Sequence, residues 1–445
     1  MHDEIFWRHF MHLSFKRFIR RILVPLALVL LCPPMVIFAW YTNVELGGSL
    51  LNLWNLFQSQ GVFTTIWKVW APIFFGSKTA WSMIAVFGGA QLLFMKFLPG
   101  KKVAGPLTPK GNIPIYKANG PLAFVVTLFS FYFATQFFHL FPATIIYDNF
   151  GPLLGALNSF SLVFCLFLCI KGYVAPSTSD SGGTGNFIFD YFWGTELYPR
   201  IFGWDVKMFT NCRFGMMGWG LVILSFAAKQ TQLHGITNSM LVAVVLQLIY
   251  IAKFFIWETG YLRSMDIMHD RAGYAICWGC LVWVTGIYTS PTLYLVNHPI
   301  HLSTLSVTIL MTLGTAGIII NYLADLQRQR FRATSGNCLI WRKKPKFIQA
   351  SYKTTEGDKK TNLLLISGWW SLARHFHYLP EILAAFCWSA PALFSHVLPY
   401  YYLIFLTALL IDRAFRQEKR CAIKYGTHWE SYCKKVPYKL IPFVY

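Results

Sequence analysis

The stretch "RFIRRILVPLALVLLCPPMVIFAWY", residues 17–41, begins with three arginines and continues as one long apolar run. The run is longer than the ~20 residues that an α-helix needs to cross a bilayer. It has the basic flank of a signal peptide but no small-residue cleavage site, so we expect it to remain as a membrane span. Similar apolar runs recur along the chain, which predicts an all-α polytopic membrane protein.

The composition supports this fold class. Of the 445 residues, 55% are hydrophobic and 18% are aromatic, but only 13% are charged. Soluble globular domains carry about 25% charged residues. An ordinary soluble enzyme is therefore excluded.

Hydropathy and charge together predict about ten transmembrane helices with both chain ends on the cytosolic side. The spans are expected near 20–41, 79–98, 120–143, 151–172, 214–230, 237–257, 272–290 and 302–323, followed by a pair within 381–411. The segment 63–75 is too short and too basic at its centre for a span, so it is placed at the interface. The predicted organisation is a short basic cytosolic N-terminus (1–19), an N-terminal group of helices (20–230) and a C-terminal catalytic half (231–445).

The formal charge of +21 could suggest a nucleic-acid partner. The basic residues instead collect beside apolar segments, at the N-terminus, at 101–117, at 328–360 and after 412. Cytosolic loops of membrane proteins have this distribution under the positive-inside rule. We therefore expect membrane lipid, and no nucleic acid, as the partner of these loops.

Two long polar segments interrupt the apolar pattern. Residues 173–213 contain "APSTSDSGGTGNF" and form a loop too long to be a simple connector. Residues 324–362 are strongly basic and are expected to form a hydrated hairpin or loop. Cys277 and Cys280 form a C-x-x-C motif, but no second pair follows at zinc spacing, so no metal site is predicted.

Acidic residues gather after one predicted span, in "FFIWETGYLRSMDIMHD" (254–270). On a continuing helix, Asp266, His269 and Asp270 would share one face through their i, i+3, i+4 spacing. With Glu258 they could form a proton-donating site, since partial burial raises carboxyl pKa values. A solvated cytosolic loop is the alternative.

Basic and aromatic residues gather in two later segments. "LADLQRQRFRATSG" (323–336) places Arg328 and Arg332 on one helical face. Residues 413–432 contribute a further set, namely Arg413, Lys424, Tyr425 and Tyr432. Guanidinium groups suit phosphate recognition and aromatic faces suit stacking on a flat ring, although a basic membrane collar would show the same residues.

A third segment, "SGWWSLARHFHYLPE" (367–381), lies between these two on the same predicted side. Its polar and aromatic residues could form the wall of a pocket that opens to the cytosol. These residues are Trp369, Trp370, Arg374, His375, His377 and Tyr378. Helix capping or hydrogen bonding in the core would explain the histidines equally well.

Several long motifs, in order along the chain, carry a resemblance to a known family. They are "LTPKGNIPIYKANG" (107–120), "TGNFIFDYFWGTELYPRI" (184–201), "MDIMHD" (265–270), "LYLVNHP" (293–299), "LLLISGWWSLARHFHYL" (363–379) and the C-terminal segment from 395 to 445. Over roughly residues 105–445 the chain resembles the sterol reductase family, which includes Δ14-sterol reductases, 7-dehydrocholesterol reductases and part of the lamin B receptor. The segments 224–242 and 337–357 and the motif "ARHFHY" (373–378) are most similar to the 7-dehydrocholesterol reductases.

The resemblance implies a ten-helix enzyme that reduces a sterol C=C bond with NADPH, bound in a cytosol-facing pocket of the C-terminal half. The residues that match the family's cofactor contacts are Arg328, Arg332, Trp370, Arg374, His377, Arg413, Lys424, Tyr425 and Tyr432. Protonation of the alkene would precede hydride transfer, because an unactivated alkene is a poor hydride acceptor. The candidate proton donors are Tyr250, Glu258, Asp266 and His269. The expected membrane is the endoplasmic reticulum in a eukaryote or the inner membrane in a bacterium.

The chain departs from the family pattern at a few positions, and these leave the reduced bond open. Gln417, Cys280 and Pro291 replace the usual residues, and "YLPE" (378–381) replaces a Gly-Asp after the tyrosine. The Δ7 bond is expected, with Δ14 and Δ24 as alternatives. Two other classes also share features: S-adenosylmethionine-dependent membrane methyltransferases, and non-catalytic sterol-binding scaffolds. The oligomeric state is not predicted.

Overall fold

The computed structural model describes residues 18–108, 110–353 and 359–444. The predicted cytosolic N-terminus (1–19) therefore lies almost wholly outside the described residues, as does the "TEGD" part of the 324–362 segment. The chain forms two compact units. The first, called here the N-terminal unit, contains Met1–Gly235 and Tyr261–Asn297, and the second, the C-terminal unit, contains Ile236–Gly260 and His298–Tyr445. The predicted division into N-terminal helices (20–230) and a C-terminal catalytic half (231–445) stays a prediction.

The multi-pass membrane fold is confirmed. Within the described residues, eight helices are long and apolar enough to cross a bilayer. They are Ile19–Glu45, Lys78–Phe97, Gly120–Phe137, Phe150–Val174, Asn238–Ile256, Tyr274–Asn297, Thr304–Ala333 and Leu398–Tyr425. The two other predicted spans correspond to α10 (Met216–His234) and the shorter α17 (Tyr378–Ser389), so roughly ten helices are present.

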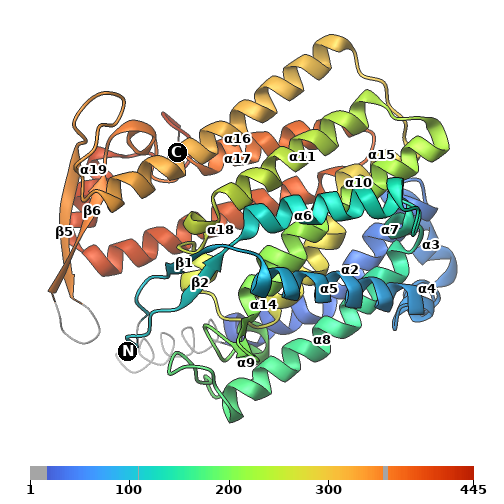
Figure 1. The fold of residues 1–445 in the computed structure, drawn as a ribbon, viewed down its shortest axis with the longest axis horizontal. Coiled ribbons are helices and arrows are strands. Elements are labelled where there is room, and N and C mark those ends of the chain that lie inside the picture. Colours follow the sequence, from blue (N-terminus) through green and yellow to red (C-terminus); the bar gives the residue numbers. More distant parts are fainter. Residues whose placement is uncertain (1–17, 109, 354–358, 445) are drawn as a thin grey trace, which may run out of the picture. The chain divides into compact units, whose positions relative to one another are not determined.

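The N-terminal unit is a helical bundle (Figure 1). Its long helices are α2 (Val24–Glu45), α5 (Lys78–Phe97), α6 (Gly120–Tyr132), α8 (Phe150–Val174) and α10. Its shorter helices are α3 (Leu50–Gln60), α4 (Val62–Trp70), α7 (Ile145–Asp148), α9 (Phe187–Trp193), α13 (Met265–Met268), α14 (Tyr274–Trp278) and α15 (Ser290–Asn297). The segment expected at the interface forms α4, which at nine residues is too short to span.

Hydroxyl side chains set the start of several helices. Ser77 accepts a hydrogen bond from the backbone N–H of Ala80 at the start of α5, at 3.1 Å. Thr237 caps α11 (Asn238–Ile256) in the same way. Such caps satisfy backbone donors that the helix itself leaves without partners.

Two small hairpins belong to the N-terminal unit. β1 (Lys101–Ala104) pairs with β2 (Ile115–Ala118), and β3 (Arg200–Ile201) pairs with β4 (Trp204–Asp205), both antiparallel. The β1–β2 hairpin connects the end of α5 to the start of α6 (Figure 1). The β3–β4 hairpin lies in the long 173–213 segment, which thus contains regular structure as well as loop.

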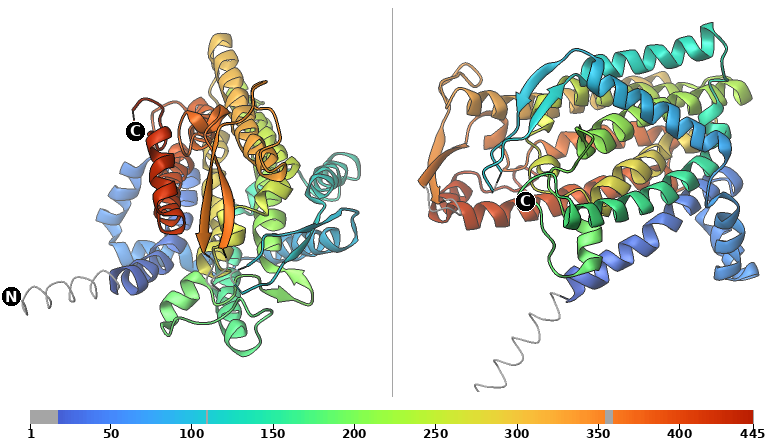
Figure 2. Two further views of the ribbon diagram at one scale, coloured as in Figure 1. Left: turned by 90° about the vertical axis from the view of Figure 1, so that its left-hand side faces the viewer. Right: turned by 60° about the horizontal axis from the view of Figure 1, so that its bottom comes forward.

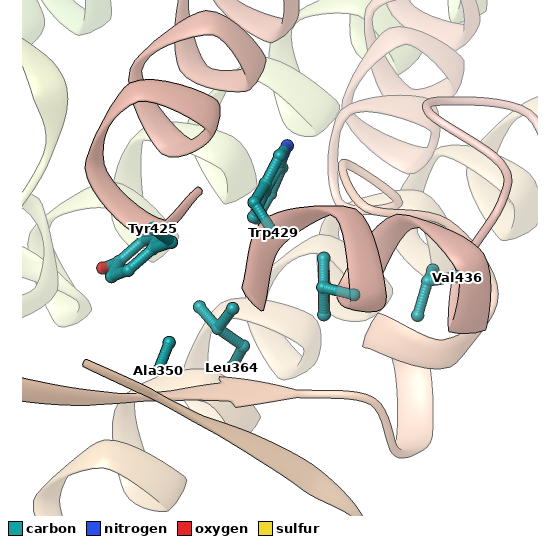
Figure 3. Packing of buried hydrophobic residues seen from close by; sticks show 6 residues of the cluster. Ala350, Leu364, Tyr425, Trp429 and Val436 are labelled. Atoms are coloured by element: carbon teal, nitrogen blue, oxygen red, sulfur yellow. The ribbon is translucent and has the colours of Figure 1, made fainter. Parts of the chain in front are cut away.

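The C-terminal unit combines α11, α16 (Thr304–Ala333), α17, α18 (Tyr401–Tyr425) and α19 (Thr427–Lys435) with a hairpin. This hairpin, β5 (Phe347–Lys353) with β6 (Lys359–Leu365), forms where a hydrated hairpin or loop was expected. Both views in Figure 2 show it as a long two-stranded ribbon. It packs on the end of α18 and on α19 through a small apolar cluster (Figure 3). The cluster contains Ala350, Leu364, Tyr425, Trp429, Tyr432 and Val436.

Candidate functional site

The "MDIMHD" motif does not continue a helix, so the expected shared face of Asp266, His269 and Asp270 is wrong. α13 ends at Met268 after four residues. The cause is Lys207, whose buried ammonium group donates hydrogen bonds to the carbonyl oxygens of Asp266, Ile267 and Asp270 at 3.1, 2.7 and 2.8 Å. Since these carbonyls point at one cation, they cannot all accept helical hydrogen bonds.

The acidic residues of this region are nevertheless buried rather than solvated. Glu258 is 2% exposed and Asp266 is 8% exposed, whereas His269 is exposed. Asp266 and His269 belong to the N-terminal unit, and Glu258 and Tyr250 belong to the C-terminal unit. The four predicted proton donors are therefore divided equally between the two units.

A polar network crosses the C-terminal unit between α11, α16 and α17. The Tyr250 hydroxyl donates to Glu381 at 2.9 Å. The Asn321 amide donates to the other oxygen of Glu381 at 3.4 Å and to the carbonyl of His377 at 2.8 Å. Lys253 donates to the Asn321 side-chain oxygen. Sequence reasoning missed Glu381 as a site residue, although it is part of the "YLPE" departure and so carried a signal.

Arg328 and Trp370 form the second part of the site. The Arg328 guanidinium carbon lies 4.1 Å from the centre of the Trp370 ring, in cation–π geometry, and the group also pairs with Asp325 at 3.0 Å. The buried Trp370 indole donates to the carbonyl of Ala324 at 2.9 Å. The indole is therefore held in one orientation by α16, with a guanidinium stacked on its face.

The histidines continue this aromatic group. The His377 ring lies 4.9 Å from that of Trp370 and 4.2 Å from that of Tyr378. Its Nδ1 atom is buried and has no hydrogen-bond partner among the described residues. Burial lowers the pKa of His377 well below its usual value, and nearby Arg328 adds to the effect. His377 is therefore neutral at pH 7.

Arg374 is occupied by the protein itself. Its guanidinium pairs with Glu418 at 2.8 Å and donates to the carbonyls of Val436 and Pro437 at 2.6 and 2.9 Å. His375 approaches the same Glu418 oxygen at 3.2 Å, and burial lowers its pKa. These contacts tie the segment before α17 to α18 and to the chain after α19, so Arg374 supports the site from outside.

The remaining cations surround the end of α18. The Lys424 ammonium lies 4.0 Å from the centre of the Tyr352 ring. Tyr425 is buried, and its hydroxyl accepts a hydrogen bond from Asn362 at 2.8 Å. Arg332 is exposed and lies within electrostatic reach of Tyr425 and Tyr432. The β5–β6 hairpin thus contributes Tyr352 and Asn362 to the surroundings of Lys424 and Tyr425. The sequence did not point to these two residues, because they belong to no recognisable motif.

Tyr432 and Arg413 complete the predicted set. The Tyr432 ring stacks on Trp429 at 4.9 Å, and burial raises the pKa of its hydroxyl. Arg413 on α18 is half-buried and lies within electrostatic reach of His377 and Tyr378. All nine predicted cofactor residues therefore belong to one unit, in contact groups built by α16, the 367–378 segment, α18, α19 and the hairpin.

Comparisons with known proteins agree with this architecture. The chain matches the ergosterol biosynthesis ERG4/ERG24 family over residues 35–445. A 7-dehydrocholesterol reductase from Arabidopsis thaliana is 51% identical over 422 residues, covering 94% of this chain and 96% of that protein. One from Xenopus laevis is 40% identical over 371 residues, covering 82% and 78%.

A more distant relative carries a different name. A Δ14-sterol reductase from Methylotuvimicrobium alcaliphilum is 35% identical over 424 residues and covers 94% of both chains. Because the match extends over nearly the whole length, this chain belongs to the ERG4/ERG24 family of sterol reductases, which are membrane proteins.

Proposed function

We propose that the chain is an NADPH-dependent sterol reductase that saturates the Δ7 double bond, as in conversion of 7-dehydrocholesterol to cholesterol. Support for the Δ7 position comes from the relatives' names and identities. The relative named for the 7-dehydro substrate is 51% identical, against 35% for the Δ14-sterol reductase. The proposed location is the endoplasmic reticulum membrane in a eukaryote, or the inner membrane in a bacterium.

The observation that carries the cofactor proposal is a pair of cations, Arg332 and Lys424, beside aromatic rings. Among the described residues, neither Arg332 nor Lys424 has a carboxylate within ion-pair distance. Both lie beside aromatic rings, Lys424 at Tyr352 and Arg332 near Tyr425. Excess positive charge next to flat rings suits a ligand with phosphates and aromatic bases. The residues present therefore fit NADPH.

The proposed roles follow from these contacts. Arg332 and Lys424 bind phosphate, and Arg328 binds phosphate while stacked on Trp370. Tyr425, Tyr432, Arg413 and His377 line the same site, with the free Nδ1 of His377 able to accept a hydrogen bond. Arg374 holds the 367–378 segment in place. When bound, NADPH supplies the hydride.

We propose that side chains of the protein supply the proton. Protonation of the alkene gives a tertiary carbocation, and addition of a hydride completes the saturation. We propose Tyr250 and Glu258 as donors in the C-terminal unit, with Glu381 as the hydrogen-bond acceptor that orients the Tyr250 hydroxyl. Asp266 and His269 remain proposed members of the relay.

The cofactor proposal is tested by thermal unfolding of the purified protein in detergent, titrated with NADPH, NADH and S-adenosylmethionine. Stabilisation by NADPH is expected, because a ligand that binds only the folded state raises the unfolding temperature. Arg332→Gln should weaken NADPH binding by about tenfold or more, since a charge-assisted hydrogen bond contributes about 1.5–3 kcal/mol. Stabilisation by S-adenosylmethionine alone would overturn the proposal in favour of a methyltransferase.

A matched control is Lys435→Gln, which removes the same charge from an exposed position at the end of α19. We expect this variant to bind NADPH like the unmodified protein. An equal loss in both variants would mean that net charge, and not a phosphate site at Arg332, controls binding.

A further inference from the structure

A cavity of about 260 Å³ lies in the N-terminal unit, and none of the residues assigned above lines it. It is bordered by the end of α5, strand β2, the β3–β4 hairpin and the π-helical turn Met208–Gly215. Its lining is Met95, Lys96, Ile115, Tyr116, Lys117, Arg200, Phe202, Gly203, Trp204, Asp205, Met208 and Arg213. The proposed sterol and cofactor chemistry uses none of these side chains.

The charge of the lining is strongly positive. Four of its side chains are cations, and Asp205 is the one carboxylate among the lining residues. Arg200 donates to the Ile115 carbonyl at 2.8 Å, and Lys117 donates to the Lys96 carbonyl at 2.8 Å, so protein carbonyls position these two cations without neutralising them. The Lys96 ammonium lies 5.2 Å from the centre of the Trp204 ring.

The buried polar atoms of the lining include two that have no partner among the described residues. These two are the hydroxyl oxygen of Tyr116, which is 4% exposed, and one carboxyl oxygen of Asp205. A buried polar atom without a partner costs about 1–3 kcal/mol, so such atoms mark places where a further group binds. Burial also raises the pKa of the Asp205 carboxyl.

The cavity lies where the bilayer ends. α5 and α6 are both membrane-spanning helices, and the β1–β2 hairpin joins the end of one to the start of the other (Figure 1). The hairpin is therefore at the level of the lipid headgroups. Two apolar side chains, Ile115 in the lining and Phe97 at the end of α5, are exposed, as expected where acyl chains cover the protein.

Phe202 gives an independent sign of contact with lipid. It is 92% exposed at the tip of the β3–β4 hairpin, and its φ of 48° lies in the left-handed region that phenylalanine rarely adopts. Asn or Gly would be favoured at such a turn position. An aromatic residue held there at a conformational cost, at the edge of a basic cavity, is suited to insertion into the interface.

We propose that this cavity binds the phosphate group of an anionic phospholipid, with the cations around the phosphate and Phe202 beside the acyl chains. Tyr116 donates its free hydroxyl to a phosphate oxygen. The chemistry recognised is the phosphate, so a soluble phosphate ester is the other source that the experiment must separate.

The test is native mass spectrometry of the purified full-length chain, together with thermal unfolding in nanodiscs. We expect the protein to retain one phosphatidylglycerol in preference to phosphatidylcholine and to unfold at a higher temperature in phosphatidylglycerol discs. Lys96→Gln should reduce this preference about three- to tenfold, because a cation near an anionic surface contributes about 1 kcal/mol. Lys96 makes no described side-chain hydrogen bond within the protein, so this variant should fold.

The control is Lys102→Gln, which removes an exposed cation from strand β1, six residues after Lys96 and outside the cavity lining. It should keep the preference. Equal preference in the Lys96 variant and the unmodified protein, or equal loss in both variants, overturns the proposal. Stabilisation in phosphatidylcholine discs by millimolar glycerol phosphate would assign the site to a soluble phosphate, whereas stabilisation by phosphatidylglycerol alone assigns it to lipid.

Discussion

At the scale of single residues, two arginines of the C-terminal unit have different environments. Arg332 is exposed near aromatic rings and without a described acidic partner, whereas Arg374 is buried and fully engaged with Glu418 and two carbonyls. Sequence reasoning grouped both as cofactor residues, because motif position carries no information on burial. The contacts give Arg374 a structural environment that Arg332 lacks, in keeping with the proposed supporting role of Arg374 and the proposed binding role of Arg332.

This difference gives a stability prediction. Arg374→Ala leaves Glu418 and two carbonyls without their cation, so we expect a loss of about 3–5 kcal/mol, as for other broken buried pairs. Arg416→Ala is the matched control, because Arg416 pairs with Asp412 at a similar 2.7 Å on an exposed face, where about 0.3–0.5 kcal/mol is expected. Thermal unfolding in detergent measures both, and similar losses would argue against the supporting role of Arg374.

At the scale of elements, hydropathy predicted the long apolar helices and missed features fixed by distant contacts. The short α13 ends where Lys207 binds its carbonyls, and that lysine is about sixty residues earlier in the chain. α17 contains only twelve residues, so its sequence gives a weak signal. Tyr250, Asn321 and Glu381 form one hydrogen-bond network because three helices pack together. A local sequence pattern cannot predict such packing.

The packing of α16 on α17 depends on Gly317. A methyl group built there would lie 2.8 Å from the carbonyl oxygen of Pro380, closer than real contacts allow. Gly317→Ala should therefore push the helices apart, lower stability by about 1–3 kcal/mol and disturb the network of Asn321 and Glu381. Unfolding temperature and reductase activity are the measurements.

Gly89→Ala in α5 is the control, since a methyl group there meets no atom within 4 Å. It should leave the unfolding temperature unchanged or raise it, because alanine favours helix more than glycine does. A Gly317 variant as stable and active as the Gly89 variant would mean that close packing of α16 and α17 does not position the network.

At the scale of the whole molecule, this member of the ERG4/ERG24 family is a basic, aromatic-rich membrane protein with membrane-spanning helices in both units. The sequence motifs predicted the family and the fold class. They could not predict the basic cavity of the N-terminal unit, because its cations come from four segments that only folding brings together. In the proposed reaction, the cofactor supplies the hydride and the protein supplies the proton.

The most direct test is isotopic labelling of the reaction itself. Purified protein in nanodiscs is given 7-dehydrocholesterol with deuterated NADPH in ordinary water, and then ordinary NADPH in deuterated water, and the sterol is analysed by mass spectrometry. We predict loss of the Δ7 bond with one carbon-bound deuterium in each experiment, one from the cofactor and one from the solvent. An unchanged sterol, or a label that comes from a single source, would contradict proton addition followed by hydride transfer.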